Sequence, residues 1–264
     1  MVDFFLNLNY LYQALLAGMF TWFITLLGAL LVCFFKNVES KVMDLMLGLS
    51  AGVMIAASFW SLLLPALELS KEINKISWLL PSLGFLFGSI FLFFSDIIFK
   101  NILKRKSNAS SMHKNILLIF SITLHNIPEG MAVGIAFGSL KYGLEGASMT
   151  AALMLALGIG IQNFPEGAAV SLPLKRNGMK TKNAFFLGQL SGFVEPIFAF
   201  LGALLAIKLR LILPFILTFA AGAMIYVVVS ELIPESQSGK NKDMVSLFTL
   251  IGFLIMMILD VAFS

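Results

Sequence analysis

Residues 125–130 read HNIPEG and residues 162–167 read QNFPEG, so the pattern (H/Q)-N-x-P-E-G occurs twice, 37 residues apart. Each copy lies inside a long apolar stretch, 115–140 and 146–174, in which its glutamate is the one charged residue. A carboxylate in the middle of a lipid-exposed helix costs about 2.5–3.5 kcal/mol on insertion scales. Two such glutamates at matching positions therefore indicate a function beyond packing.

The composition around these motifs is that of a membrane protein. Of 264 residues, 59% are hydrophobic and 12% are charged, and the mean hydropathy is +0.95. Soluble domains have roughly 45–50% apolar and about 25% charged residues, so a soluble enzyme, a disordered chain and a nucleic-acid-binding module are poor fits. The single cysteine, Cys33, excludes an intrachain disulfide and a cysteine-based metal cluster.

Charged residues divide the chain into apolar stretches long enough to cross a bilayer, which takes about 20 residues. The stretches are continuous rather than alternating, which favours helices over barrel strands. We therefore expect an all-α polytopic membrane protein with a single domain, 1–264. Its eight transmembrane helices are expected at roughly 10–35, 43–67, 77–99, 115–140, 146–174, 183–208, 211–234 and 244–263.

Lysine and arginine in the loops predict the orientation, because cytoplasmic loops carry an excess of both. The loops after the first, third, fifth and seventh helices hold 13 of these residues, and the other loops hold 5. The basic side is therefore expected to be cytoplasmic, with both termini extracellular. The net charge of +4 is then a topology signal and not a sign of a nucleic-acid partner.

The two motif helices would run in opposite directions, which makes the motifs an inverted repeat. Inverted repeats with interrupted helices are typical of transporters, whose sites lie near the bilayer midplane. His125 and Glu129 are four residues apart and share a helix face, as do Gln162 and Glu166. Together they would present an imidazole, an amide oxygen and two carboxylates, a set that suits zinc. A neighbouring site, with Glu166 bridging, could use Asn126, Asn163 and Glu195.

Prolines accompany the buried glutamates. Pro128 and Pro165 lack an N–H and would free the carbonyls of Leu124 and Ile161. Other acidic residues have simpler expected roles: Asp96 and Asp260 near span ends could mark the membrane interface. Glu68, at the outer end of its helix, could attract incoming cations or only be solvated at the rim. Glu231 and Glu235, near the inner end of theirs, could belong to an exit path.

Two alternatives remain open on the residues alone. A proton or other cation carrier could use the same buried carboxylates, or the motifs could be proline kinks with protonated glutamates. An intramembrane metalloprotease would need a pattern such as HExxH, and ATP-driven transport would need GxxxxGK(S/T); neither pattern occurs. We therefore expect a transporter and not an enzyme.

At these motifs the sequence resembles the ZIP family of divalent metal transporters, in particular its GufA-like bacterial branch. The resemblance extends to 56–68, 188–202 and 230–235. It implies zinc import through an elevator-like, alternating-access movement, with Fe²⁺, Mn²⁺ and Cd²⁺ as further candidate substrates. It also implies a multi-pass protein of the plasma (inner) membrane, in contact with lipid, that is able to form a homodimer.

The resemblance further implies two metal positions on the fourth, fifth and sixth helices. The first would be held by His125, Glu129, Gln162 and Glu166, and the second by Asn126, Asn163, Glu166 and Glu195. Members of this branch often have Asp where this chain has Asn163, which predicts a weaker second position. They often have His where this chain has Ser230, which argues against a third position using Glu231.

Overall fold

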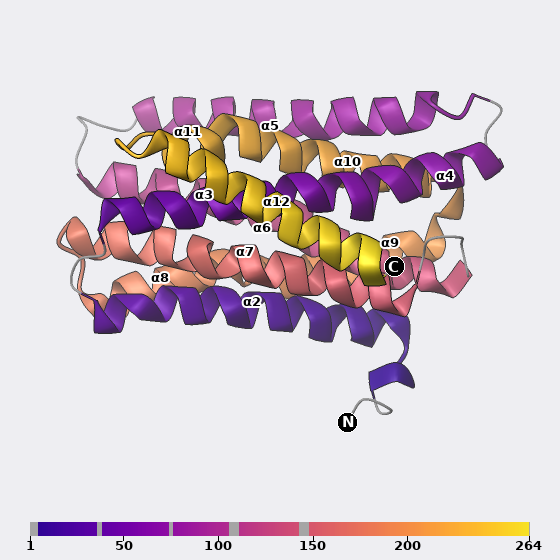
Figure 1. Cartoon of the computed structure of the whole chain (residues 1–264), viewed down its shortest axis with the longest axis horizontal. Helices are drawn as coiled ribbons and strands as arrows, with labels where there is room; N and C mark the ends of the chain where they lie inside the picture. Colours follow the sequence, from indigo (N-terminus) through magenta and orange to yellow (C-terminus); the bar gives the residue numbers. More distant parts are fainter. Residues whose placement is uncertain (1–4, 36–38, 74–75, 106–110, 143–147, 264) are drawn as a thin grey trace.

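The regular secondary structure of the described residues is entirely helical. The computed structural model of the protein describes residues 5–35, 39–73, 76–105, 111–142 and 148–263. Within these ranges, the side chains of residues 73, 99, 100, 102–105, 111–118, 120–122, 124, 125, 210 and 263 lie outside the description. The helices run side by side along the long axis of the molecule (Figure 1).

The long helices follow the predicted apolar stretches. They are α2 (Tyr10–Phe34), α3 (Ser40–Ala57) continued by η1 (Ser58–Leu63) and α4 (Leu64–Ile73), α5 (Leu79–Arg105), α6 (Ser111–Ser139), α7 (Met149–Arg176), α8 (Thr181–Gly192), α9 (Val194–Lys208), α10 (Leu213–Val227) continued by η4 (Val228–Leu232) and α11 (Ile233–Ser236), and α12 (Lys242–Phe263). Short 3₁₀ turns, η2 (Leu140–Tyr142) and η3 (Arg210–Ile212), follow α6 and α9.

Six stretches of the described chain are long and apolar enough to cross a membrane. The helices α6 and α7, with 29 and 28 residues, are also long enough to cross a membrane. The structure thus supports an all-helical membrane protein with six to eight spanning helices.

The stretch predicted as one helix, 183–208, is two helices. Phe193 has turn geometry between α8 and α9, and its N–H bonds to the Leu190 carbonyl. Pro196 explains the interruption, since its missing N–H removes a helical hydrogen bond at this point. As a result, Glu195 lies in the first turn of α9, where the positive end of the helix dipole favours a carboxylate.

Two other helices contain a π-helical turn, a feature often found at functional sites. The η1 turn ends two residues before Pro65, and the η4 turn ends two residues before Pro234. Both α3–η1–α4 and α10–η4–α11 continue through the π turn and the proline without a break.

The helices pack most extensively in four pairs: α6 with α9, α2 with α7, α5 with α10, and α3 with α12. The first two pairs together with α8 are called the motif group below, and the remaining long helices the flanking group. Glycine allows close approach within both groups. The Gly167 backbone lies against the Thr25 carbonyl of α2, and Gly52 lies against the Thr249 carbonyl of α12. Side chains at these glycines would collide with backbone atoms of the partner helix.

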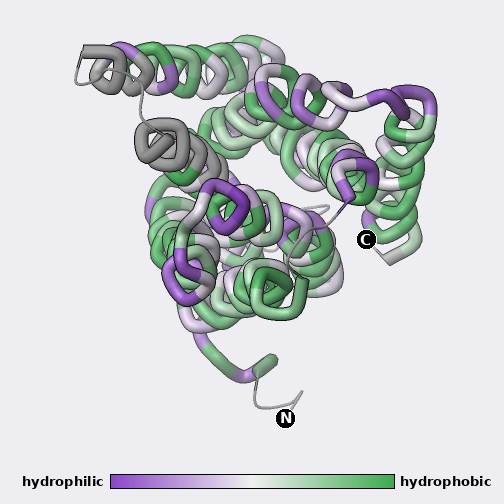
Figure 2. Tube along the Cα trace, turned by 90° about the vertical axis from the view of Figure 1, so that its left-hand side faces the viewer, coloured by the Kyte–Doolittle hydropathy of each residue, from purple (hydrophilic) through white to green (hydrophobic). Residues whose placement is uncertain are grey.

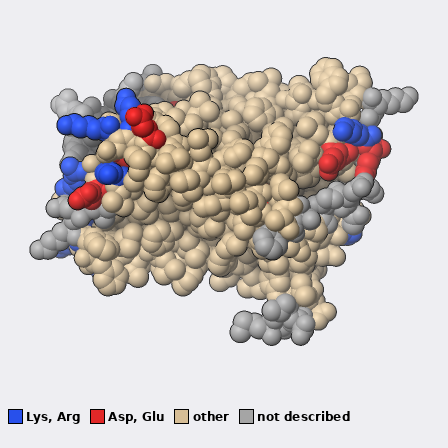
Figure 3. Space-filling model, in the orientation of Figure 1, with Lys and Arg blue, Asp and Glu red and all other residues tan. Residues whose placement is uncertain are grey.

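Hydrophobic residues cover the outside of the molecule as well as its core. Figure 2, which looks along the helices, shows apolar residues on their outward faces. Phe87, Phe91 and Phe94 of α5, for example, are each about half exposed. Charged side chains gather at the two ends, with a wide uncharged band between them (Figure 3). This distribution is that of a protein surrounded by hydrocarbon.

Candidate metal centre

The two sequence motifs face each other inside the motif group. Gln162 on α7 donates a hydrogen bond from Nε2 to Glu129 Oε1 on α6 at 2.6 Å. The two copies are thus joined directly, through the amide of one and the carboxylate of the other. The backbone of His125 belongs to α6, but its side chain lies outside the described residues.

The predicted residues with described side chains are almost completely removed from solvent. Their exposed fractions are 1% for Asn126, 0% for Glu129, Gln162, Asn163 and Glu195, and 3% for Glu166. Burying a polar group without a hydrogen-bond partner is costly, and burying an unpaired charge more so. The hydrogen-bond partners of these side chains are therefore decisive.

Glu195 has donors for both of its carboxylate oxygens. Asn163 Nδ2 lies 2.7 Å from Glu195 Oε2, and Thr25 Oγ1 lies 3.3 Å from Glu195 Oε1. Asn126 Nδ2 donates to the Ser191 carbonyl of α8 at 2.9 Å. These bonds join α7, α2, α9, α6 and α8 around one buried polar cluster.

Several oxygens of this cluster have no hydrogen-bond partner among the described residues. They are Asn126 Oδ1, Glu129 Oε2, Gln162 Oε1, Asn163 Oδ1 and both carboxylate oxygens of Glu166. Each lone oxygen forgoes a hydrogen bond that water would have supplied, at a cost of about 1–3 kcal/mol. A bound cation would satisfy such oxygens, because carboxylate and amide oxygens act as metal ligands.

The charges of the cluster favour the same ligand. Glu129, Glu166 and Glu195 lie close enough together that their ionised carboxylates would repel one another. A divalent cation would convert this repulsion into attraction. Among the side chains the structure describes, no three His, Cys, Asp or Glu residues come close enough to hold one ion. The unpartnered oxygens of the described side chains consequently come from both carboxylates and amides.

Backbone contact holds the cluster together. A Cβ at Gly130, just after Glu129, would lie 2.6 Å from the Glu195 carbonyl oxygen. Only glycine lets α6 approach α9 this closely, and the approach brings Glu129 and Glu195 into the same region.

Comparisons with known proteins agree on one family. A profile of the family described as "ZIP Zinc transporter" matches residues 106–260, which include both motifs and Glu195. The chain belongs to the ZIP family. It is 36% identical to "Zinc transporter ZIP11" of Bos taurus, an alignment that covers 94% of this chain and 96% of that one. It is also 35% identical to "Zinc transporter GufA" of Myxococcus xanthus, over 96% of this chain and 98% of that one.

A second bacterial relative belongs to the same family. "Zinc transporter ZIPB" of Bordetella bronchiseptica is 33% identical, over 94% of this chain and 81% of its own length. The resemblance seen in the motifs is confirmed, including its bacterial branch. These relatives carry the names of transporters and not of enzymes, in line with the expectation for this chain.

A cavity of 420 Å³ leads to Glu166 from one end of this ZIP-family chain. It lies between α3, α7 and the η4–α11 stretch, and Glu231 and Glu235 line it together with Glu166. From the sequence, both glutamates are expected near the inner end of their helix, where a role in an exit path is open. Ser230 lines the same cavity.

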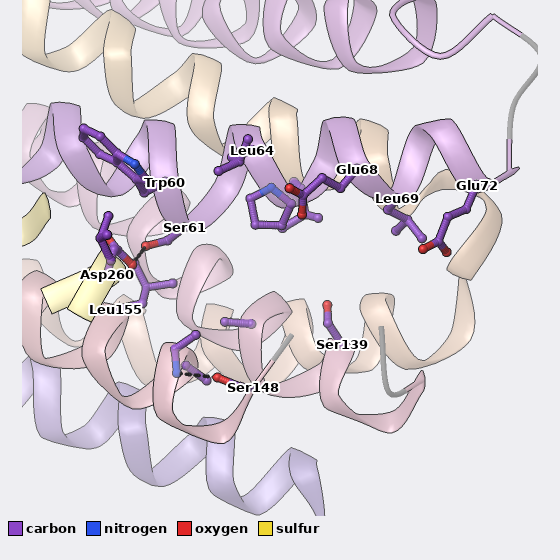
Figure 4. Close-up of a pocket in the computed structure, with 16 residues that line it drawn as sticks. Trp60, Ser61, Leu64, Glu68, Leu69, Glu72, Ser139, Ser148, Leu155 and Asp260 are labelled. Carbon is purple, nitrogen blue, oxygen red and sulfur yellow. Dashed lines mark hydrogen bonds between the residues drawn. The ribbon is translucent and has the colours of Figure 1, made fainter. Parts of the chain in front are cut away.

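A second cavity, of 370 Å³, opens toward the other end of the flanking group (Figure 4). Glu68 and Glu72 of α4 line it, and Ser139 and Ser148 lie on its opposite side. Its lining also contains Leu155 of α7, about two turns before Gln162. Glu68, expected at the outer end of its helix, is exposed and lines this cavity.

Asp260 is the residue whose position the sequence did not predict. It was expected at the membrane interface, yet it is only 5% exposed and lines the second cavity. Ser61 Oγ donates to Asp260 Oδ1 at 2.6 Å, and Asp260 Oδ2 is buried with no partner among the described residues. The available signal was an acidic residue that interrupts the otherwise apolar stretch 244–263.

Proposed function

We propose that this chain transports zinc across the plasma (inner) membrane, with Fe²⁺, Mn²⁺ and Cd²⁺ as further substrates. The observation that carries the proposal is the set of buried oxygens without partners among the described residues, which gathers on the two motif helices around Glu129, Gln162 and Glu166. Membership of a family of zinc transporters, and relatives named zinc transporters, support the same substrate.

In this proposal the first ion position uses His125, Glu129, Gln162 and Glu166. The arriving ion exchanges its water for these ligands, and the two carboxylates balance its charge. Asn126, Asn163, Glu166 and Glu195 form the adjoining position. That position is the weaker one, because Asn163 brings no charge and already donates to Glu195. Ligand protonation lowers metal affinity and so favours release.

Alternating access follows from the two cavities in this proposal. The cavity at Glu166 is open at the end where Lys175, Arg176 and Lys180 lie, which the loop charges predict to be cytoplasmic. On α7, the turn around Ile159, which is fully buried, separates Leu155 of the other cavity from the motif. The ion would reach the opposite side only when the motif group moves relative to the flanking group, as in an elevator.

The helix pairs support an inverted repeat as the basis of this movement. In such a repeat, the pair α2 and α7 corresponds to the pair α9 and α6. The pair α5 and α10 corresponds in the same way to the pair α12 and α3. The π turns before Pro65 and Pro234 fall on matching helices of this scheme. The first long helix begins, and α12 ends, in the same half of the molecule (Figure 1), as expected for eight crossings with both termini outside.

Uptake into vesicles tests the proposal. Purified protein in liposomes should take up zinc in a saturable way, and the other three metals should compete. A fluorescent pH indicator inside the same vesicles tests the alternative of a proton carrier. Proton flux in the absence of any divalent metal, with no zinc uptake, would reject zinc transport in favour of that alternative.

A further inference from the structure

We propose that Ser50 and Met256 of the flanking group hold α7 in its present register and thereby set how often the motif group moves. The proposal rests on the alternating-access function above. Both residues contact the same short stretch of α7, Gly158–Gln162, which leads into the second motif. They do so from different helices, α3 and α12.

Ser50 contributes a hydrogen bond between the two groups. Its side chain is fully buried on α3, and Oγ donates to the Gln162 carbonyl of α7 at 3.1 Å. The hydrogen bonds of Asn126, Gln162 and Asn163 described above join helices within the motif group, and that of Ser61 joins helices within the flanking group. Ser50 therefore links the flanking group to the backbone of a residue proposed to bind the ion.

Met256 contributes a steric contact. A Cβ at Gly158 would lie 2.1 Å from Met256 Sδ, and the Met256 side chain is fully buried. The thioether thus occupies the space that the glycine leaves on α7. One helical turn away in either direction, the corresponding positions are Leu155 and Gln162, whose side chains are much larger. The fit exists in this register and is lost when α7 slides by a turn.

A movement of α7 away from α3 and α12 would break both contacts together, because the Ser50 hydrogen bond and the packing of Met256 against Gly158 both need close approach of the helices. A hydrogen bond of this kind changes an equilibrium between two states by roughly 2- to 12-fold. Removing the Ser50 hydroxyl should therefore raise the population of the alternative state by that factor. The effect is largest, in relative terms, on a reporter that reacts only in the alternative state.

Cysteine labelling measures this population. The single cysteine, Cys33, is exposed and is first replaced by alanine. Ile159→Cys then places a thiol in the buried turn between the second cavity and the motif, where a water-soluble maleimide reacts only after α7 has moved. With Ser50→Ala in this background, the labelling rate should rise about 2- to 12-fold. An unchanged rate in a protein of unchanged melting temperature overturns the proposal.

Three further variants distinguish the proposed role of Ser50 and Met256 from a general destabilisation of the fold. Ser89→Ala is the matched control, because Ser89 Oγ donates to the Gly222 carbonyl at 2.9 Å between two helices of the flanking group. It should leave the labelling rate unchanged, and an equal rise would overturn the proposal. Ser50→Thr keeps the hydroxyl and should restore slow labelling.

Gly158→Ala tests the Met256 contact while keeping the Ser50 bond, and it also serves if Ser50→Ala does not fold. It should raise the labelling rate, and no rise would overturn the role of Met256. Zinc uptake measured on the same parent protein separates the two proposals. If the parent protein takes up zinc but Ser50→Ala does not change the labelling rate, only the role of Ser50 and Met256 is rejected. If Ser50→Ala raises the labelling rate but the parent protein takes up no zinc, only zinc transport is rejected.

Discussion

Gln162 and Glu129 share one hydrogen bond of 2.6 Å, from the amide Nε2 of α7 to the carboxylate Oε1 of α6. The bond fixes the orientation of both groups. The amide oxygen of Gln162 and the second oxygen of Glu129 are left buried without partners among the described residues. This one contact between the repeated motifs therefore leaves two oxygens available for a cation. It also pairs the Gln162 N–H group, which cannot bind a cation.

Replacing Glu166 should have the largest effect on transport, since neither of its oxygens has a partner among the described residues and the residue lines the 420 Å³ cavity. We expect Glu166→Gln to reduce zinc uptake by liposomes at least tenfold, because a carboxylate ligand and its charge are lost. Glu235→Gln changes an exposed glutamate of the same cavity and should retain most uptake. Equal losses in both variants would argue against Glu166 as a ligand.

Asn163→Asp should strengthen the second ion position. Asn163 Nδ2 now donates to Glu195 Oε2 at 2.7 Å. The substitution replaces this donor with a carboxylate oxygen, so two carboxylates would face each other. A cation is then needed to separate the two charges. Calorimetric titration with zinc should show more ions bound per protein than in the unchanged chain. The exposed Asn177, altered in the same way, provides the comparison, and identical stoichiometry in all three proteins would contradict the prediction.

Gly167→Ala should destabilise the motif group. The added Cβ would lie 2.1 Å from the Thr25 carbonyl oxygen, so α2 and α7 must move apart. Overpacking of this kind costs about 1–3 kcal/mol, which should lower the melting temperature in detergent. At Gly160 the nearest atom is Cε1 of Phe20, at 3.1 Å, and that ring can shift. Gly160→Ala should therefore melt close to the unchanged protein, and a reversed order would refute the packing argument.

Asp260→Asn should weaken the binding of the incoming ion more than it slows the transport step. The carboxylate lines the second cavity, and one of its oxygens has no partner among the described residues, so it would attract a cation before the cation reaches the motifs. We expect the KM for zinc uptake to rise several-fold with little change in maximal rate. Asp243→Asn, at the exposed start of α12, should leave KM unchanged. A lower maximal rate with constant KM would place Asp260 in the movement itself.

The sequence predicted the helical class, the approximate helix positions and the family because each depends on local pattern. Long apolar stretches identify membrane helices without knowledge of their partners. The repeated motif indicated a meeting of Glu129 with Gln162, and the structure brings these two residues together. The metal ligands themselves, including the unobserved role of the His125 side chain, remain predictions.

Features that depend on contacts between helices were not predicted. The break at Phe193 was hidden because 183–208 is mostly apolar and Glu195 is its one acidic residue, and Pro196 alone does not reveal a separate helix. The buried place of Asp260 requires knowing that α12 packs against η1 and so brings Ser61 to it. Distance along the chain, 199 residues between these two, carries no signal of such a meeting.

The buried turn at Ile159 has a consequence for how fast ions can cross. In the proposed alternating-access mechanism, ions do not follow one another in single file, because the buried Ile159 lies on α7 between the cavity at Leu155 and the one at Glu166. Each ion would wait for a rearrangement of whole helices, which takes microseconds to seconds. Electrical recording from a planar bilayer containing the protein should accordingly show no discrete current steps at any voltage.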